Sequence, residues 1–129
     1  MKTYALPRHF CAVFALACLL LFSSDTAFAV SPEEQPRIEA LLVAIGKQED
    51  LIFIRNGSEY TAQEAVSHLG LKLRRAGSRI NTAEEFIDHL ASNSSFSGKS
   101  YMIKRQGQPE EAAGPFLHRL LREVAPSFQ

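Results

Sequence analysis

The sequence predicts an α+β fold, a single small domain in which three or four helices pack on a small antiparallel sheet of two or three short strands. Three segments begin with Ser or Thr and carry Glu three residues later, which is the capping box that starts helices. Each of these segments leads into apolar residues at helical spacing. An Asn-Gly pair follows a short apolar run and favours a two-residue hairpin turn. Helices mixed with a few short antiparallel strands indicate the α+β class.

The first 29 residues show the order of features that is typical of a secretory signal peptide. Lys2 and Arg8 give a positive start, residues 10–22 are an uninterrupted apolar run, and Ala27-Phe28-Ala29 offers small residues to a signal peptidase, so we expect cleavage after Ala29. The apolar run is shorter than the about 20 residues that cross a bilayer. We therefore expect no stable membrane insertion after cleavage, with a retained anchor or a lipid on Cys18 as the alternatives.

Cleavage would leave residues 30–129 as one α+β domain without cysteine, because Cys11 and Cys18 both lie in the signal segment. A disulfide, a thiol nucleophile and a thiolate metal site are then excluded. The whole chain carries 14 basic and 14 acidic residues, and the domain alone stays close to neutral. This balance gives no electrostatic case for binding nucleic acid or an anionic membrane surface.

The predicted elements follow one another along this domain. Ser31-Pro32-Glu33-Glu34 starts the first helix, whose apolar stripe runs over residues 38–45. A hairpin then pairs residues 51–54 with the short segment Glu59-Tyr60. A second helix is predicted from Thr61 to about Ala76, and a third helix is capped by Thr82. A Ser/Gly-rich loop follows over residues 92–100, and then a strand over residues 101–104 that pairs with residues 51–54. A polar connection over residues 106–114 leads to a final helix after Pro115.

Motifs for catalysis, metals and nucleotides are missing or incomplete. Gly98-Lys99-Ser100 resembles the end of a phosphate-binding loop, but the earlier Gly of that motif is Asn93 here, and a helix precedes the loop where a strand is needed. His68, His89 and His118 lack the spacing of a local metal site, and no G-x-S-x-G nucleophile elbow occurs. The sequence therefore predicts no catalytic residue, no metal site and no cofactor.

Acidic residues occur in pairs, at Glu33-Glu34, Glu84-Glu85 and Glu110-Glu111. We interpret these pairs as charge that suits the N-terminal ends of helices, not as catalytic carboxylates. Asp88 and His89 are neighbours on a predicted helix and point in different directions, which argues against a local acid–base pair.

Polar residues around the hairpin and the second helix form the candidate binding site. Arg55 and Tyr60 flank the predicted turn, while His68 and Lys72, four residues apart, lie together beside the apolar stripe of the helix. If the hairpin folds onto that helix, these donors converge on an anionic group such as a carboxylate or phosphate. A solvated rim with scattered ion pairs is the alternative interpretation. The predicted ligand-binding residues are Arg55, Asn56, Tyr60, His68, Lys72, Arg79 and Lys99.

Two runs of the sequence, F-I-R-N-G-S-E-Y-T-A-Q-E-A-V-S-H-L-G-L-K-L and R-I-N-T-A-E-E-F-I-D-H-L-A-S-N-S-S-F-S-G-K-S-Y, resemble a family of small exported bacterial proteins catalogued as domain-of-unknown-function family 5329. The resemblance covers about residues 38–103 and is weakest after Gly107. It implies a Gram-negative bacterial source and a periplasmic destination, and it implies no activity, substrate or cofactor. The residues that it places within family motifs are Arg55, Asn56, Gly57, His68, Lys72, Arg79, Thr82, Ser97, Gly98 and Lys99.

These observations together favour a non-catalytic periplasmic binding module, whose partner is a small anionic ligand or an envelope protein. One alternative is a small hydrolase that uses His68 as a base near a loop serine such as Ser97. Another is an envelope-maintenance protein that docks its partner through an exposed apolar patch, expected on the last helix near Phe116 and Leu120.

Overall fold

The computed structural model of the protein describes residues 30–126, so the predicted signal segment, residues 1–29, lies outside the described part. Helices and short strands mix along this part as predicted, which confirms the α+β class. None of its helices combines the length and the hydropathy that crossing a bilayer requires. The helices are α1 (Gln35–Gly46), α2 (Ala62–Ala76), α3 (Ala83–Phe86) and α4 (Ala113–Val124), with a 3-10 turn η1 (Gly77–Arg79) after α2 and a π-helical turn η2 (Ile87–Ala91) that continues α3. The strands are β1 (Ile52–Arg55), β2 (Ser58–Thr61), β3 (Met102–Lys104) and β4 (Glu111–Ala112).

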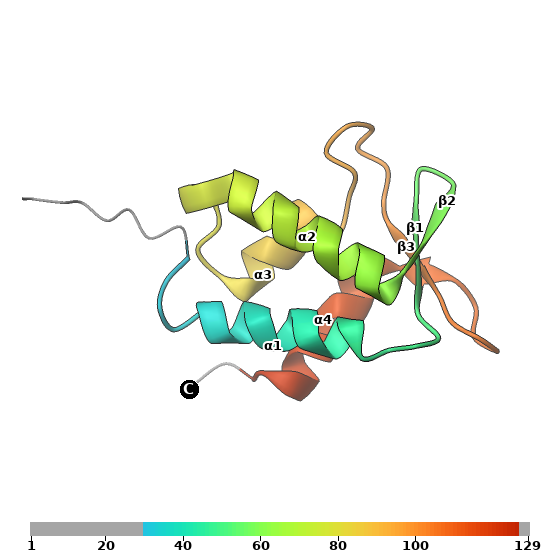
Figure 1. Ribbon diagram of the computed structural model, residues 1–129, viewed down its shortest axis with the longest axis horizontal. Coiled ribbons are helices and arrows are strands. Elements are labelled where there is room, and N and C mark those ends of the chain that lie inside the picture. The colour runs from blue at the N-terminus through green and yellow to red at the C-terminus, as the bar shows by residue number, and fades with distance from the viewer. Residues whose placement is uncertain (1–29, 127–129) are drawn as a thin grey trace, which may run out of the picture.

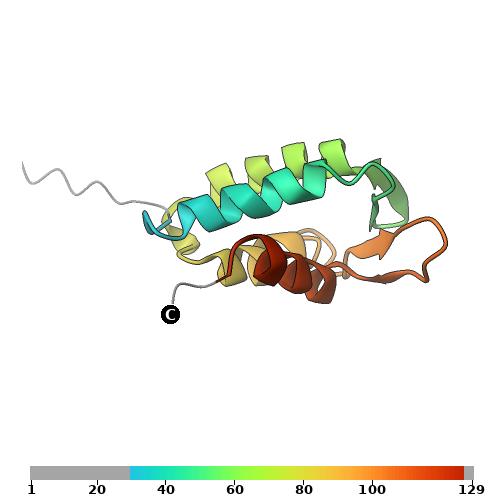
Figure 2. The same ribbon diagram turned by 90° about the horizontal axis from the view of Figure 1, so that it is seen from below.

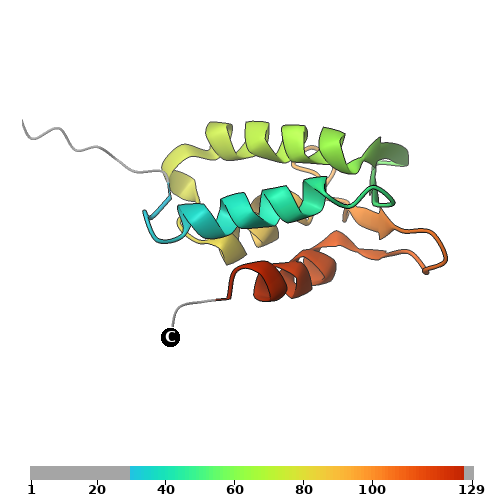
Figure 3. The same ribbon diagram turned by 60° about the horizontal axis from the view of Figure 1, so that its bottom comes forward.

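The helices form two layers, and the sheet lies at one end of them (Figure 1). Helices α1 and α2 lie side by side in one layer, while α4 and the segment α3–η2 form the other (Figures 2 and 3). The hairpin of β1 and β2 and the loop over residues 92–100 project side by side from the same end (Figure 1). The core lies between the two layers. Its largest fully buried side chains are Ile38, Leu41, Ile45, Leu51, Leu69, Phe86, Ile87, Ile103, Leu117 and Leu121.

The sheet is antiparallel throughout, in the order β2-β1-β3-β4. Asn56 and Gly57 occupy the turn between β1 and β2 with φ of 50° and 82°, as a two-residue hairpin turn with positive φ at both positions requires. Strand β3 pairs with β1 so that Phe53 lies opposite Ile103. The predicted hairpin and the predicted pairing of residues 51–54 with residues 101–104 are therefore confirmed.

The sheet has one strand more than the two or three predicted. Strand β4 contains only Glu111 and Ala112, which pair with Ile103 and Met102 of β3, so the prediction of an irregular connection over residues 106–114 is wrong at its end. Two residues are too few to show the alternation of a strand, and the pairing is made by the backbone alone. Because β4 leads directly into α4, it fixes where the last helix begins.

Helix α1 begins three residues later than the sequence predicts. Glu34, not Ser31, is its N-cap residue, and the backbone carbonyl of Ser31 accepts a hydrogen bond from the N–H of Glu34 at 3.0 Å. The capping box predicted at Ser31 is therefore wrong. The carboxylate of Glu34 instead accepts hydrogen bonds from Arg37 at 2.8 Å and from the N–H of Ala83 at 2.8 Å. Pro36 stabilises the late start, because its fixed φ suits the first turn of a helix.

The helix starts predicted at Thr61 and Thr82 are confirmed. The hydroxyl of Thr61 accepts from the N–H of Glu64 at 3.3 Å, and the Glu64 carboxylate accepts from the N–H of Thr61 at 2.8 Å, which completes a capping box. The hydroxyl of Thr82 accepts from the N–H of Glu85 at 3.0 Å. The Glu85 carboxylate reaches one residue further back, to the N–H of Asn81 at 2.8 Å.

A buried ion-pair network that joins three helices is a feature the sequence does not reveal. Arg37 of α1 is only 6% exposed. Its guanidinium donates to Glu34 at 2.8 Å, to Glu84 of α3 at 2.6 Å, and to the carbonyl of Ala125, after α4, at 3.1 Å. The interpretation of Glu34 and Glu84 as helix-dipole charges is thus incomplete, because both are mainly partners of Arg37. Hydrogen bonding from Arg37 lowers the pKa of Glu84 below its ordinary value of 4.5.

We expect Arg37→Met to lower the free energy of unfolding by about 3 kcal/mol, because it removes the partner of two carboxylates at a buried site. Denaturation in urea measures this change. Arg122→Met is the matched control, since Arg122 is exposed on α4, and it should change stability by less than about 0.5 kcal/mol.

The loss of stability in Arg37→Met should also depend on pH. The pKa of Glu84 is lowered in the folded protein, so its pairing with Arg37 stabilises the fold above about pH 4.5, and this contribution is lost as the pH falls. The difference between wild type and Arg37→Met should therefore shrink on acidification. A difference that stays constant down to about pH 3 would contradict this account.

Candidate functional site

Two adjoining cavities lie where the hairpin and the loop over residues 92–100 meet α2. The first has a volume of about 480 Å³ and lies between α2 and the hairpin. The second is larger, about 780 Å³, and runs from the hairpin turn along α2 to η1, facing the end of η2. We call them the apolar cavity, formed by Phe53, Tyr60, Ala65 and Leu69, and the cationic groove, formed by Lys72, Arg75 and Arg79. Arg55, His68 and Tyr101 line both.

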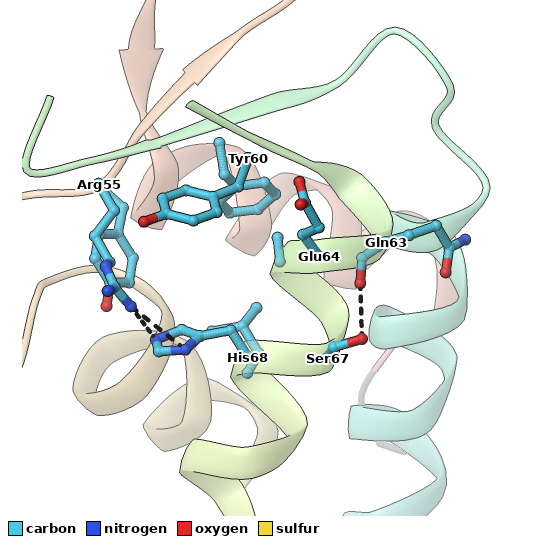
Figure 4. Close-up of a pocket in the computed structure, with 10 residues that line it drawn as sticks. Arg55, Tyr60, Gln63, Glu64, Ser67 and His68 are labelled. Carbon is cyan, nitrogen blue, oxygen red and sulfur yellow. Dashed lines mark hydrogen bonds between the residues drawn. The ribbon is translucent and has the colours of Figure 1, made fainter. Parts of the chain in front are cut away.

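Arg55 and His68 meet because α2 starts directly where the hairpin ends. Arg55 is the last residue of β1, and His68 lies almost two turns into α2. The Nη1 atom of Arg55 is 2.8 Å from Nε2 of His68 and 3.4 Å from its Nδ1. The guanidinium carbon of Arg55 also lies 5.4 Å from the ring centre of Tyr60. Figure 4 shows Arg55 and His68 joined across the cavity, whereas the hydroxyl of Ser67, which also lines it, donates to the backbone carbonyl of Gln63.

Lys72 connects α2 to the far wall of the cationic groove. Its ammonium donates to the carbonyl of Leu90, to the carbonyl of Asn93 at 3.2 Å, and to the hydroxyl of Tyr101 at 3.3 Å. The nitrogen also lies 5.1 Å from the ring centre of Tyr101, within the range of a cation–π interaction. Leu90 and Asn93 lie at and beyond the end of the helical segment, where carbonyls lack helical partners. Lys72 therefore fixes the start of the loop over residues 92–100.

The loop over residues 92–100 is held against the hairpin turn by Asn56. The amide nitrogen of Asn56 donates to the buried hydroxyl of Ser94 at 3.3 Å, and its amide oxygen accepts from the hydroxyl of Ser97 at 2.6 Å. Gly98 allows the loop to turn sharply, with φ of 69° and its N–H donating to the carbonyl of Ser94 at 2.9 Å. The turn and the loop thus form one wall.

Burial and the positive charges that line this groove shift the pKa values of its titratable residues. Burial, and then the charges of Arg55, Lys72 and Arg75, lower the pKa of His68 below 6.5. Burial and the charge of Arg55 likewise lower the pKa of Lys72. Burial raises the pKa of Tyr101, although the neighbouring Arg55 acts against this rise. His68 is therefore neutral at pH 7 and accepts a hydrogen bond from Arg55.

The structure brings most of the predicted binding residues together. Arg55, Asn56, His68, Lys72 and Arg79 all line the cationic groove. Tyr60 lines the apolar cavity beside it, whereas Lys99 is exposed on the loop and lines neither cavity. Sequence reasoning missed the other residues that line the groove, which are Arg75, Ala76, Ile80, His89, Leu90, Ser94, Ser95, Phe96 and Tyr101. Only Arg75, one turn of helix after Lys72, had a signal in its spacing.

The arrangement does not favour the hydrolase alternative. His68 is paired with Arg55, and the hydroxyl of Ser97 donates to Asn56. Over residues 30–126, no hydrogen bond joins His68 to Ser97, although general-base catalysis needs the two groups within about 3 Å or bridged by one water. Within the described residues, the contacts of His68 and Ser97 therefore do not show a nucleophile beside its base.

The expected docking patch on the last helix is a wrong prediction. Phe116 and Leu120 are buried in the core, because α4 packs these side chains against the other helices. The large apolar side chains that are exposed in the described part of the chain are Val43, Phe96 and Val124. Phe96 is the most exposed, at 98%, and it lies on the loop beside the cationic groove.

One polar pair outside the two cavities joins distant segments. His118 of α4 lies with Nε2 2.7 Å from Oδ1 of Asp88 in η2, which the sequence could not indicate from their separation. Among the residues that the structure describes, no three His, Cys, Asp or Glu side chains gather as a metal site would require.

The comparisons with known proteins match this domain as a whole. The profile of a family of unknown function, DUF5329, matches residues 32–125. The chain belongs to this family. The uncharacterized protein YfeK of Salmonella typhimurium is 47% identical over 91 residues, which are 70% of this chain and 72% of that protein. No solved structure gave a significant match.

The family resemblance inferred from the two sequence runs is therefore confirmed. The DUF5329 profile extends past residue 107 to the end of α4, where the resemblance was weakest. The last helix is thus part of the family's domain, in keeping with its buried side chains.

We expect Lys72→Met to lower the free energy of unfolding by about 1 to 2 kcal/mol, because the carbonyls of Leu90 and Asn93 lose a charged donor. The amides of residues 92–100 should exchange their hydrogens faster, as amide exchange followed by NMR would measure. Lys99→Met, which changes an exposed lysine of the same loop, should leave both quantities unchanged. Equal exchange rates in wild type and Lys72→Met would show that Lys72 does not hold the loop.

Proposed function

We propose that this DUF5329 protein is a non-catalytic binding module that holds a small anion in the cationic groove. The observation that carries this proposal is a concentration of positive charge without a counterion. Arg55, Lys72, Arg75 and Arg79 line the groove, and none of the described residues that line it is acidic. A chain that is close to neutral as a whole thus gathers four cations around one cavity.

The acidic residues that form ion pairs pair with cations outside the groove, which strengthens this argument. Among the ion pairs found between residues 30 and 126, none includes an arginine or lysine of the groove. The bases that carry those pairs are Arg37, Lys104, Arg105, His118 and Arg119. The groove cations repel one another, and an anion between them would relieve that repulsion.

The hydrogen-bond donors of the groove suit an oxygen anion. The guanidinium of Arg55 is a planar fork that can bind a carboxylate or a phosphate through two hydrogen bonds. Lys72 contributes its positive charge to the same groove, although its ammonium already donates to Leu90, Asn93 and Tyr101. A small anion in solution and an anionic group presented by an envelope protein would both use these contacts.

We also propose that the protein acts in the periplasm. Residues 1–29 have the charge, apolar run and small residues of a signal peptide. The domain that follows contains no cysteine, so its fold is independent of the redox state of its compartment.

Sulfate is a suitable probe, because its charge stays constant over the pH range of interest. We expect sulfate to bind in a titration followed by NMR, and Arg55→Met to raise its dissociation constant at least about tenfold, since a charged hydrogen bond is lost. Arg74→Met is the control, because Arg74 is an exposed arginine of α2 outside the groove lining. Equal weakening by both substitutions would contradict a defined site and indicate general attraction to a basic surface.

The affinity for sulfate should rise as the pH falls from about 7.5 to about 5.5. The pKa of His68 lies below 6.5 without a ligand, because burial and the charges of Arg55, Lys72 and Arg75 oppose its protonation. A bound anion favours the protonated ring, so binding takes up a proton and strengthens on acidification, by up to about tenfold for one pKa unit. His68→Gln should remove most of this pH dependence while keeping sulfate binding at about pH 7.5. His89→Gln is the comparison, because His89 also lines the groove; a dependence that is lost with His89 and not with His68 would rule out His68 as its source.

A further inference from the structure

The apolar cavity and the cationic groove share a boundary. Arg55, His68 and Tyr101 form the boundary that lines both. We propose that the ligand is an amphiphilic anion, whose apolar chain lies in the apolar cavity and whose charged head lies in the groove. This inference rests on the anion-binding function proposed above and adds the chemistry of the ligand.

The floor of the apolar cavity is suited to a hydrocarbon chain. It is made by Phe53, Ala65, Leu69 and Tyr101, all of which are buried. The small side chain of Ala65 faces the hairpin from α2 and leaves room where a larger apolar residue would close the space. A volume of about 480 Å³ lies within the range of cavities that enclose small ligands. The partly buried Tyr60 adds an aromatic wall on the side of the hairpin.

The charges at the two ends of the apolar cavity decide which way the ligand lies. Glu64 lines the cavity together with Gln63 at the start of α2, while Arg55 and His68 line its other side (Figure 4). The Glu64 carboxylate is held by the N–H of Thr61 at 2.8 Å and by the Thr61 hydroxyl at 3.0 Å. It therefore stays at the helix start and repels an anionic head from that end, so the head is directed to Arg55.

Arg55 lines both cavities, so it connects the binding of the charged head with the binding of the apolar chain. Its guanidinium lies 5.4 Å from the ring centre of Tyr60, which lines the apolar cavity, and 2.8 Å from His68, which lines the groove. A head bound to Arg55 therefore has the apolar cavity directly beside it. A simple inorganic anion would leave that cavity filled with water in contact with apolar walls, at a cost that a chain removes.

Calorimetric titration of the purified protein with acetate, decanoate, decanol and decyl phosphate tests this inference, with decanoate and decyl phosphate below their critical micelle concentrations and decanol below its solubility limit. Burial of four methylenes at roughly fourfold each predicts that decanoate binds at least about a hundredfold more tightly than acetate. Decanol should bind at least about tenfold more weakly than decanoate, because it has no charge to pair with Arg55. The comparison of decanoate with decyl phosphate then identifies the head as carboxylate or phosphate.

Ala65→Leu fills the apolar cavity and should weaken decanoate at least about tenfold while sulfate binding stays unchanged. Ala65→Val, a smaller intrusion into the same cavity, serves the same purpose if the leucine substitution prevents folding. Ala44→Leu is the matched control, because Ala44 is a partly buried alanine of α1 that lines a different surface cavity. Ala44→Leu should change neither the affinity for decanoate nor the affinity for sulfate.

The possible failures are distinguishable. If decanoate binds no more tightly than acetate while sulfate binds in an Arg55-dependent manner, the amphiphile is excluded and the anion site stands. If decanol binds as well as decanoate, the head is not recognised and the inference is overturned. If neither sulfate nor decanoate binds, the proposed function and the inference fall together.

Discussion

The candidate site depends on one constraint, the absence of any linker between the hairpin and helix α2. Thr61 is both the last residue of β2 and the N-cap of α2. The backbone must be extended at this residue and helical immediately after it, and the capping box with Glu64 fixes that transition. The hairpin consequently has one orientation relative to the helix. That orientation carries Arg55 and Tyr60 over the side of α2 that presents His68.

The rest of the fold supplies a rigid support for this junction. Arg37 connects the first turn of α1 to the start of α3 and to Ala125, directly after α4. The two helical layers are therefore held by polar contacts as well as by the core. The pairing of β1 with β3 then brings Tyr101 and the loop over residues 92–100 to the hairpin. The groove is thereby built from segments that lie far apart in the sequence but share one framework.

What the sequence could predict follows from how local each signal is. The helix caps and the Asn56-Gly57 turn involve residues within four positions of one another, and the structure confirms the turn, the full capping box at Thr61 and the hydroxyl cap at Thr82. The partners of Arg37 lie up to 88 positions away in the sequence, and no pattern in the residues near Arg37 predicts them. Tyr101 was missed for the same reason, because only the strand pairing reveals that it faces α2. The false start predicted at Ser31 shows that a local signal also fails when a distant partner competes for the same carboxylate.

The π-helical turn η2 has a consequence for how the chain can vary in length. Hydrogen bonds in a π-helical turn join residues i and i+5, one residue further apart than in an α-helix, so Ile87–Ala91 accommodates one residue more than an α-helical turn would. Deleting that residue would let the segment close as an ordinary α-helix, whereas a further insertion would displace the residues that follow. The carbonyls of Leu90 and Asn93 bind Lys72 and the hydroxyl of Ser94 binds the amide of Asn56, so an insertion here would move a wall of the groove.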